Sequence, residues 1–117
     1  ILYDENGKST SHITRFHDFD KKIVKVCFGH VAQGITKNEL VFCVLEDGSV
    51  YCMNLYNAIS SNNYDNYTKL DEISDIIDVK TIVISTPGPG WASIAAIRRD
   101  GKFYDLEEIL RNRGLVK

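Results

Sequence analysis

Several features that would assign a protein to a class at once are missing from this sequence. No apolar run approaches the roughly 20 residues that cross a bilayer, so we expect no association with membranes. The 14 lysines and arginines are balanced by 16 aspartates and glutamates, and the formal charge is −2. Because nucleic-acid-binding surfaces gather basic residues, this balance predicts no nucleic-acid partner. We expect residues 1–117 to form a single domain with one modest core.

Cysteines are few and odd in number, with Cys27, Cys43 and Cys52 as the complete set. An odd count fits a reducing compartment better than a disulfide framework, so we expect reduced thiols and a cytoplasmic location. The chain opens on Ile1, and its first residues lack the basic region and apolar stretch of a secretory signal. A sequence that opens in this way is also consistent with a piece of a larger protein.

The sequence does contain a repeated hairpin pattern. The segments 41–53 (VFCVLEDGSVYCM) and 94–106 (IAAIRRDGKFYDL) lie 53 positions apart, and each carries an Asp-Gly pair followed by a tyrosine. Asp-Gly between apolar and β-branched residues indicates a β-hairpin, because a two-residue type I′ turn needs positive φ at both central positions. We therefore predict two hairpins that turn at Asp47-Gly48 and Asp100-Gly101.

A two-residue turn in the first hairpin also determines which residues face one another. Counting outward from the turn pairs Cys43 with Cys52 at a non-hydrogen-bonded position, where Cα atoms approach to about 4.5 Å. A disulfide is geometrically possible at that spacing. We expect the two thiols to be neighbours and reduced, because the second hairpin has Ala96 and Asp105 at the equivalent positions.

A β-branched strand precedes each hairpin, in the segments 22–28 (KIVKVCF) and 79–85 (VKTIVIS). The first strand is separated from its hairpin by Gly29 to Leu40, which we predict to be a loop. The second is followed by residues 86–90, whose prolines and glycines exclude regular structure. A unit of strand, loop and hairpin therefore occurs twice, over about 21–59 and 76–117.

Two short helices are expected as well. Leu70, Ile73, Ile76 and Ile77 recur at helical spacing with Thr68 as a candidate N-cap, which predicts a short middle helix.

A C-terminal helix is predicted at Asp105 and Glu108, which have capping-box spacing, and Gly114 is placed to end it. Both arms of the first hairpin are apolar on both faces, so its strands require cover above and below. The predicted fold class is α+β and β-rich, with a short middle helix and a C-terminal helix.

The strand and hairpin together resemble a repeat of the regulator of chromosome condensation family. The first unit matches at Gly29, His30, Asp47, Gly48, Val50 and Tyr51, and the second at Asp100, Gly101, Phe103 and Tyr104. The resemblance implies a propeller-like repeat, although the Trp-Gly that usually follows the tyrosine is missing from both units. Two units cannot close a ring, so either the chain belongs to a larger array or the hairpins lie in a compact domain of another type.

The functional expectation is a noncatalytic binding or protein-interaction module with a protein partner. Repeat modules place their sites on loops at corresponding ends, which favours Trp91, Pro89, His30 and Gln33 as partner-binding residues. We expect no catalytic residue, metal or cofactor, and the oligomeric state stays open. The alternative is a small hydrolase or metal-dependent enzyme, for which His30 and the three cysteines Cys27, Cys43 and Cys52 are the candidate residues.

Overall fold

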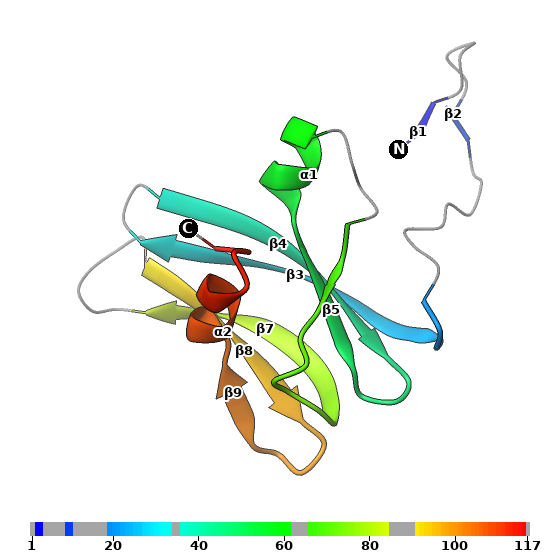
Figure 1. The fold of residues 1–117 in the computed structure, drawn as a ribbon, viewed down its shortest axis with the longest axis vertical. Helices are drawn as coiled ribbons and strands as arrows, with labels where there is room; N and C mark the ends of the chain where they lie inside the picture. The colour runs from blue at the N-terminus through cyan, green and yellow to red at the C-terminus, as the bar shows by residue number, and fades with distance from the viewer. Residues whose placement is uncertain are drawn as a thin grey trace.

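The computed structural model describes residues 2–3, 9–10, 19–33, 36–61, 66–84 and 91–116, and it has the expected β-rich α+β fold (Figure 1). A small separate pair is formed by β1 (Leu2–Tyr3) and β2 (Ser9–Thr10). The remaining elements are β3 (Ile23–Gln33), β4 (Thr36–Leu45), β5 (Val50–Asn54), α1 (Leu55–Ser61), β6 (Thr68–Lys69), β7 (Ile76–Ile84), β8 (Trp91–Arg98), β9 (Phe103–Asp105) and α2 (Glu107–Asn112).

Seven of the described strands form one antiparallel sheet. Six of them follow the order β6-β5-β4-β3-β8-β7, and β9 pairs with residues 95–97 of β8. The sheet consists of two meanders, β3-β4-β5 and β7-β8-β9. Within the part of the chain that the structure describes, the pair of Ala32 with Ala92 joins them along the sheet. The repeat expected from the sequence is therefore a repeat of whole three-stranded meanders.

The 53-residue period extends beyond the hairpins. The first strands begin at Ile23 and Ile76, and in both the register shifts after the first residue, as in a β-bulge. The second strands end at Leu45 and Arg98, and a short helix follows each third strand. We call residues 23–61 unit 1 and residues 76–112 unit 2.

The first hairpin turns at the predicted place, but the prediction of a two-residue turn is wrong. The Gly48 amide donates to the Leu45 carbonyl at 3.0 Å, and the Leu45 amide donates to the Ser49 carbonyl at 2.9 Å. With Gly48 at a φ of 85°, these bonds define a three-residue loop in which a type I turn precedes a left-handed glycine.

The second hairpin has the same turn. The Gly101 amide donates to the Arg98 carbonyl at 3.0 Å, the Arg98 amide donates to the Lys102 carbonyl at 2.7 Å, and Gly101 has a φ of 89°. In both turns the aspartate side chain accepts the amide of the residue after the glycine, at 3.0 Å.

The extra loop residue moves the register of the first hairpin by one position. Cys43 faces Tyr51 and Cys52 faces Phe42, so the predicted pairing of Cys43 with Cys52 is wrong. All three cysteines are free and buried.

The predicted loop from Gly29 to Leu40 is also wrong, because β3 continues to Gln33 and β4 begins at Thr36. Gly29 lies inside β3, where this strand crosses unit 2. A Cβ at this position would lie 3.1 Å from both Ile94 Cδ1 and Thr81 Oγ1. The glycine therefore permits a close approach of the two units and does not open a loop.

The predicted helix over Thr68 to Ile77 is wrong as well. This segment pairs with unit 1 through β6 and then turns into β7, and the Leu70 amide donates to the Val50 carbonyl at 2.9 Å. Leu70, Ile73 and Ile76 are buried. This segment turns so that every third residue enters the core, and this spacing resembles that of a helix. The middle helix is α1, where the Asn54 side chain caps the Asn57 amide at 3.1 Å.

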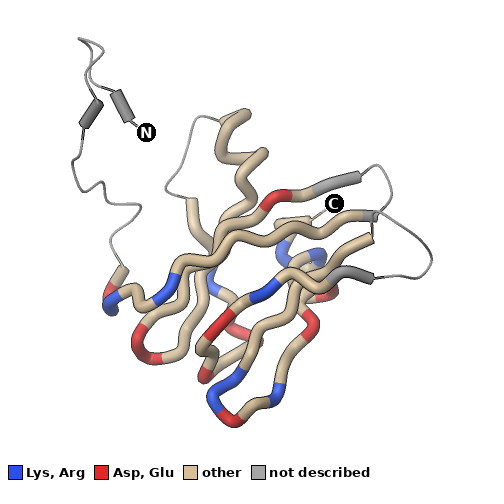
Figure 2. Tube along the Cα trace, turned by 180° about the vertical axis from the view of Figure 1, so that it is seen from behind, with Lys and Arg blue, Asp and Glu red and all other residues tan. Residues whose placement is uncertain are grey.

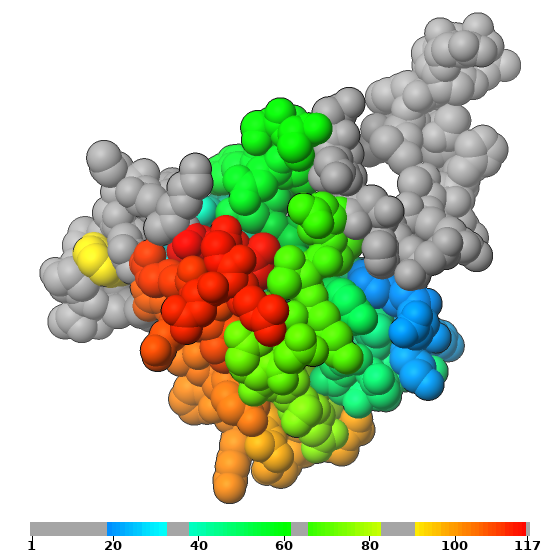
Figure 3. Space-filling view, viewed as in Figure 1, coloured from blue at the N-terminus to red at the C-terminus, as the bar shows by residue number. Residues whose placement is uncertain are grey.

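The C-terminal helix lies where the sequence predicts it, but the predicted capping box of Asp105 and Glu108 is wrong, because Leu106 is the N-cap and makes no side-chain cap bond. The Asp105 carboxylate accepts the Glu107 amide at 3.0 Å before α2, and Gly114 follows the helix at a φ of 72°. Figure 3 shows α2 and the residues after it, in red, lying against the green chain that leads into β7. Arg113 fixes this contact, since its guanidinium lies 2.7 Å from Glu72 Oε1.

The main core lies between the two units and α2. It includes Phe42, Val44 and Val50 from unit 1 and Ile94 from unit 2, with Leu110 of α2 against both. A second cluster covers the other side of unit 1 and consists of Val41, Met53 and Ala58, with Leu55 and Tyr67 packed against it. The expectation that the strands of the first hairpin need cover on both faces is confirmed for β4.

Candidate functional site

The structure brings two of the four predicted partner-binding residues, Gln33 and Trp91, to one end of the sheet. Ala32 pairs with Ala92, which places the adjoining positions Gln33 and Trp91 at the ends of neighbouring strands. Trp91 is half-buried as the first residue of β8. Pro89 lies outside the described residues.

His30 belongs to a different feature, the outward side of β3. The alternate residues Val26 and Phe28 lie on the same side of the strand as His30, and their side chains are 36% and 68% exposed. Val24, next to the bulge, is exposed too. These apolar residues were not among those expected from the sequence to bind a partner. The signal that could have found them is that the segment KIVKVCF has apolar residues on both faces of the strand.

A second exposed apolar surface lies on unit 2. Phe103 of β9 is 66% exposed and Ile82 of β7 is 40% exposed, and Ile97 and Ala95 of β8 lie between them. These side chains line an open groove of about 410 Å³, with Lys80 at its side. We call it the unit 2 groove. Apolar residues that gather on an exposed strand face mark a surface for association.

The first strands of the two units lie next to each other, as the views from opposite directions show (Figures 1 and 2). Asp78 of β7 links them: its Oδ1 lies 2.9 Å from Lys25 Nζ and accepts the Cys27 thiol at 3.6 Å. Burial by itself raises the pKa of Asp78, but the Lys25 ammonium and the Val79 amide outweigh it, and the net pKa lies below the usual value. Asp78 is therefore charged at neutral pH and holds β3 against β7.

The cysteines have the environment of core residues. Burial raises the pKa of Cys27, Cys43 and Cys52, which disfavours the thiolate that a nucleophile or a metal ligand requires. Cys27 and His30 also project from opposite sides of β3. Among the described residues, no group of three or more His, Cys, Asp and Glu side chains has the arrangement of a metal site.

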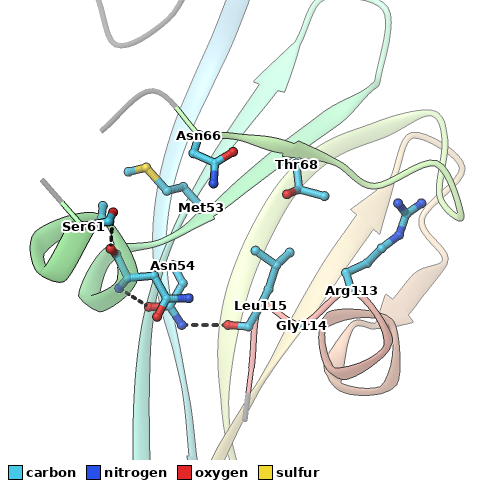
Figure 4. A pocket seen from close by; sticks show the side chains of 10 residues that line it. Met53, Asn54, Ser61, Asn66, Thr68, Arg113, Gly114 and Leu115 are labelled. Carbon is cyan, nitrogen blue, oxygen red and sulfur yellow. Dashed lines mark hydrogen bonds between the residues drawn. The ribbon is translucent and has the colours of Figure 1, made fainter. Parts of the chain in front are cut away.

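A small polar pocket of about 180 Å³ lies between α1 and the end of the chain (Figure 4). Its deepest polar group, the Asn54 amide, is 4% exposed and donates to Asn38 Oδ1 at 3.2 Å and to the Leu115 carbonyl at 2.7 Å. The rim residue Arg113 is ion-paired with Glu72. These bonds connect unit 1 to the segment after α2, so the pocket is a structural junction.

No described helix is long and apolar enough to cross a membrane. None of the known protein-family models, curated proteins or solved structures matches the chain.

Proposed function

We propose that the chain is a noncatalytic protein-interaction module that binds a protein partner through exposed apolar strand faces. The observation that carries this proposal is Phe28, a large aromatic residue that is 68% exposed in the middle of an eleven-residue strand. Burying a side chain of this size on a partner contributes roughly 1.5 to 3 kcal/mol. Aromatic residues are enriched among those that dominate binding energies.

The contact surface follows the outward side of β3 through Val26, Phe28 and His30. Trp91 and the Gln33 position form a separate contact at the strand ends. His30 supplies a polar group beside the apolar side chains, and Trp91 supplies an aromatic surface at the strand end. The module acts in the cytoplasm, where its three thiols stay reduced. The repeated meanders serve as interaction repeats of the kind that the sequence resembles.

Site-specific photo-crosslinking in the full chain tests this function. A benzoylphenylalanine in place of Phe28 should give discrete protein adducts on irradiation in cells, and adding Val26→Lys should remove them. The same probe in place of Ile77, which is 43% exposed on β7, is the matched control and should give none. Adducts at Phe28 that are no stronger than those at Ile77 would contradict the function.

A further inference from the structure

The two units are built in one register. Cys27 pairs with Phe42 in unit 1, and Lys80 pairs with Ala95 in unit 2. Lys80 lies 53 positions after Cys27, and Ala95 lies 53 positions after Phe42. The third strands correspond equally, since Val44 pairs with Val50 and Ile97 with Phe103. Side chains 53 positions apart therefore occupy the same face of the same meander.

Each unit has two faces, which we name the leading and trailing faces. The leading face of unit 1 carries Val26, Phe28 and Val41, and its equivalent in unit 2 carries Val79, Thr81 and Ile94. The trailing face of unit 1 carries Cys27, Gly29, Phe42, Val44 and Val50, and its equivalent in unit 2 carries Lys80, Ile82, Ala95, Ile97 and Phe103.

Inside the chain, the leading face of unit 2 packs on the trailing face of unit 1. Ile94 and Thr81 approach the Gly29 position so closely that an added Cβ would lie 3.1 Å from each. Val79 and Cys27 belong to the same core cluster. The units thus contact each other through opposite faces, as in a head-to-tail stack.

This stacking leaves the trailing face of unit 2 exposed, and that face is the unit 2 groove. On the trailing face of unit 1, Phe42, Val44 and Val50 lie in the main core and have less than 1% of their surface exposed. At the position of Val50, unit 2 has Phe103 with 66% exposure. The groove is therefore the surface that a further leading face would cover.

The leading face of unit 1 is open along β3, whereas over β4 it is covered by α1, against which Val41 is buried. Val26 is the equivalent of the buried Val79, and Phe28 is the equivalent of Thr81. Inside the chain Thr81 lies against the Gly29 position, and the equivalent of Gly29 in the groove is Ile82. Phe28 of another copy would therefore pack on the exposed side chain of Ile82.

We propose that the unit 2 groove binds the β3 part of the leading face of unit 1 of a second copy of this chain, with Phe28 of that copy packing on Ile82. The arrangement pairs the same two kinds of face that meet between units 1 and 2, here through β3 alone, and it rests on the proposed function because it uses the same Phe28 surface. Contacts between unlike faces join copies head to tail, into a closed ring or an open chain.

Sedimentation of the full chain over a range of concentrations tests the proposal. The wild-type mass should rise with concentration above the 13.2 kDa of a single chain. Phe28→Lys removes the leading face from every copy, and Phe103→Lys removes the groove, so each variant alone should stay at the single-chain mass. An equimolar mixture should form a dimer, because one variant keeps the groove and the other keeps Phe28.

Ile77→Lys adds the same charge at an exposed apolar residue outside both surfaces and should associate like the wild type. Thermal melting checks that each variant is folded, and Ile82→Lys replaces Phe103→Lys if that variant is not. A wild type that stays at 13.2 kDa, or a mixture that fails to dimerise, overturns the head-to-tail proposal. If Phe28 still gives adducts with other proteins in that case, the proposed function stands without it.

Discussion

Gly48 and Gly101 occupy the same position of the same turn, but their surroundings differ. Both have a φ near 90°, a conformation that costs a residue with a side chain roughly 1 to 2 kcal/mol. A Cβ at Gly48 would lie 2.7 Å from Asp75 Cα, because the turn packs on the segment that leads into β7. A Cβ at Gly101 would meet no atom within 4 Å among the described residues.

Alanine substitutions should separate these two effects. Gly101→Ala should lower the free energy of unfolding by about 1 kcal/mol, through the backbone conformation alone. Gly48→Ala should lower it by clearly more, because the Asp75 backbone must also move and the Ile76 amide bonds to the Gly48 carbonyl at 3.0 Å. Urea unfolding at neutral pH measures both. Equal losses for the two variants would mean that the contact with Asp75 contributes nothing.

The sequence predicted where each chain reversal lies and which residues make it, but not the turn type. An Asp-Gly pair suits both candidate turns, since glycine supplies the positive φ in a two-residue loop and in a three-residue loop. The difference depends on whether Leu45 bonds to Ser49, and that bond is invisible in the local sequence. This error of one position made the prediction pair Cys43 with Cys52, which the actual register separates.

The buried amide of Asn54 connects three elements at once. It caps α1, bonds to Asn38 of β4 and holds the Leu115 carbonyl after α2. Asn54→Ala should lower the free energy of unfolding by roughly 2 kcal/mol or more, because it removes the cap and leaves buried polar groups without partners. Urea unfolding measures the change.

Asn57→Ala is the matched control, since the Asn57 side chain is exposed on the same helix. It should change the stability by less than about 0.5 kcal/mol. A loss for Asn54→Ala no greater than that would show that the junction in Figure 4 does not stabilise the fold.

At the scale of elements, Asp78 joins the first strands of the two units. Its folded-state pKa is depressed, so it adds stability above its unfolded-state pKa of about 3.9, and this stability is lost as the pH falls through the folded-state value. Asp78→Asn should therefore melt at a lower temperature than the wild type at pH 7.

The difference between Asp78→Asn and the wild type should shrink as the pH falls below about 4. Melting temperatures measured from neutral to acidic pH check this. Glu46→Gln, at an exposed carboxylate in the first turn, is the control. The difference in melting temperature between this variant and the wild type should not shrink as the pH falls. A difference that stays constant with pH would mean that the Asp78 charge does not hold the strands together.

The elements themselves were predictable to different degrees for physical reasons. The C-terminal helix has its signals in the local sequence, with Asp105 before it and Gly114 after it. The middle helix is only seven residues long and has no charged residue at either end, and its cap is a buried asparagine whose role depends on tertiary contacts. The segment from Leu70 to Ile76 imitated a helix because long-range packing, and no local bond pattern, determines which of its residues are buried.

At the scale of the molecule, the sequence indicated the duplication but not how the two copies meet. Both faces of each meander are apolar, so the pattern does not say which face is covered. The stacking depends on long-range contacts such as Gly29 against Ile94, and it leaves Phe28 and Phe103 at the two open faces. Of the residues proposed from the sequence, His30 lies on one of these faces, while Trp91 and the Gln33 position lie at the strand ends.

Backbone amide chemical shifts followed by NMR over a concentration series of the full chain locate the contact residue by residue. We predict progressive shifts at Val26 and Phe28 on β3 and at Ile82, Ile97 and Phe103 around the groove. The amide of Leu115, which lies in the main core, should stay unchanged and serves as the internal reference. Spectra that do not change with concentration, or changes confined to α1 and other surfaces, would contradict the head-to-tail arrangement.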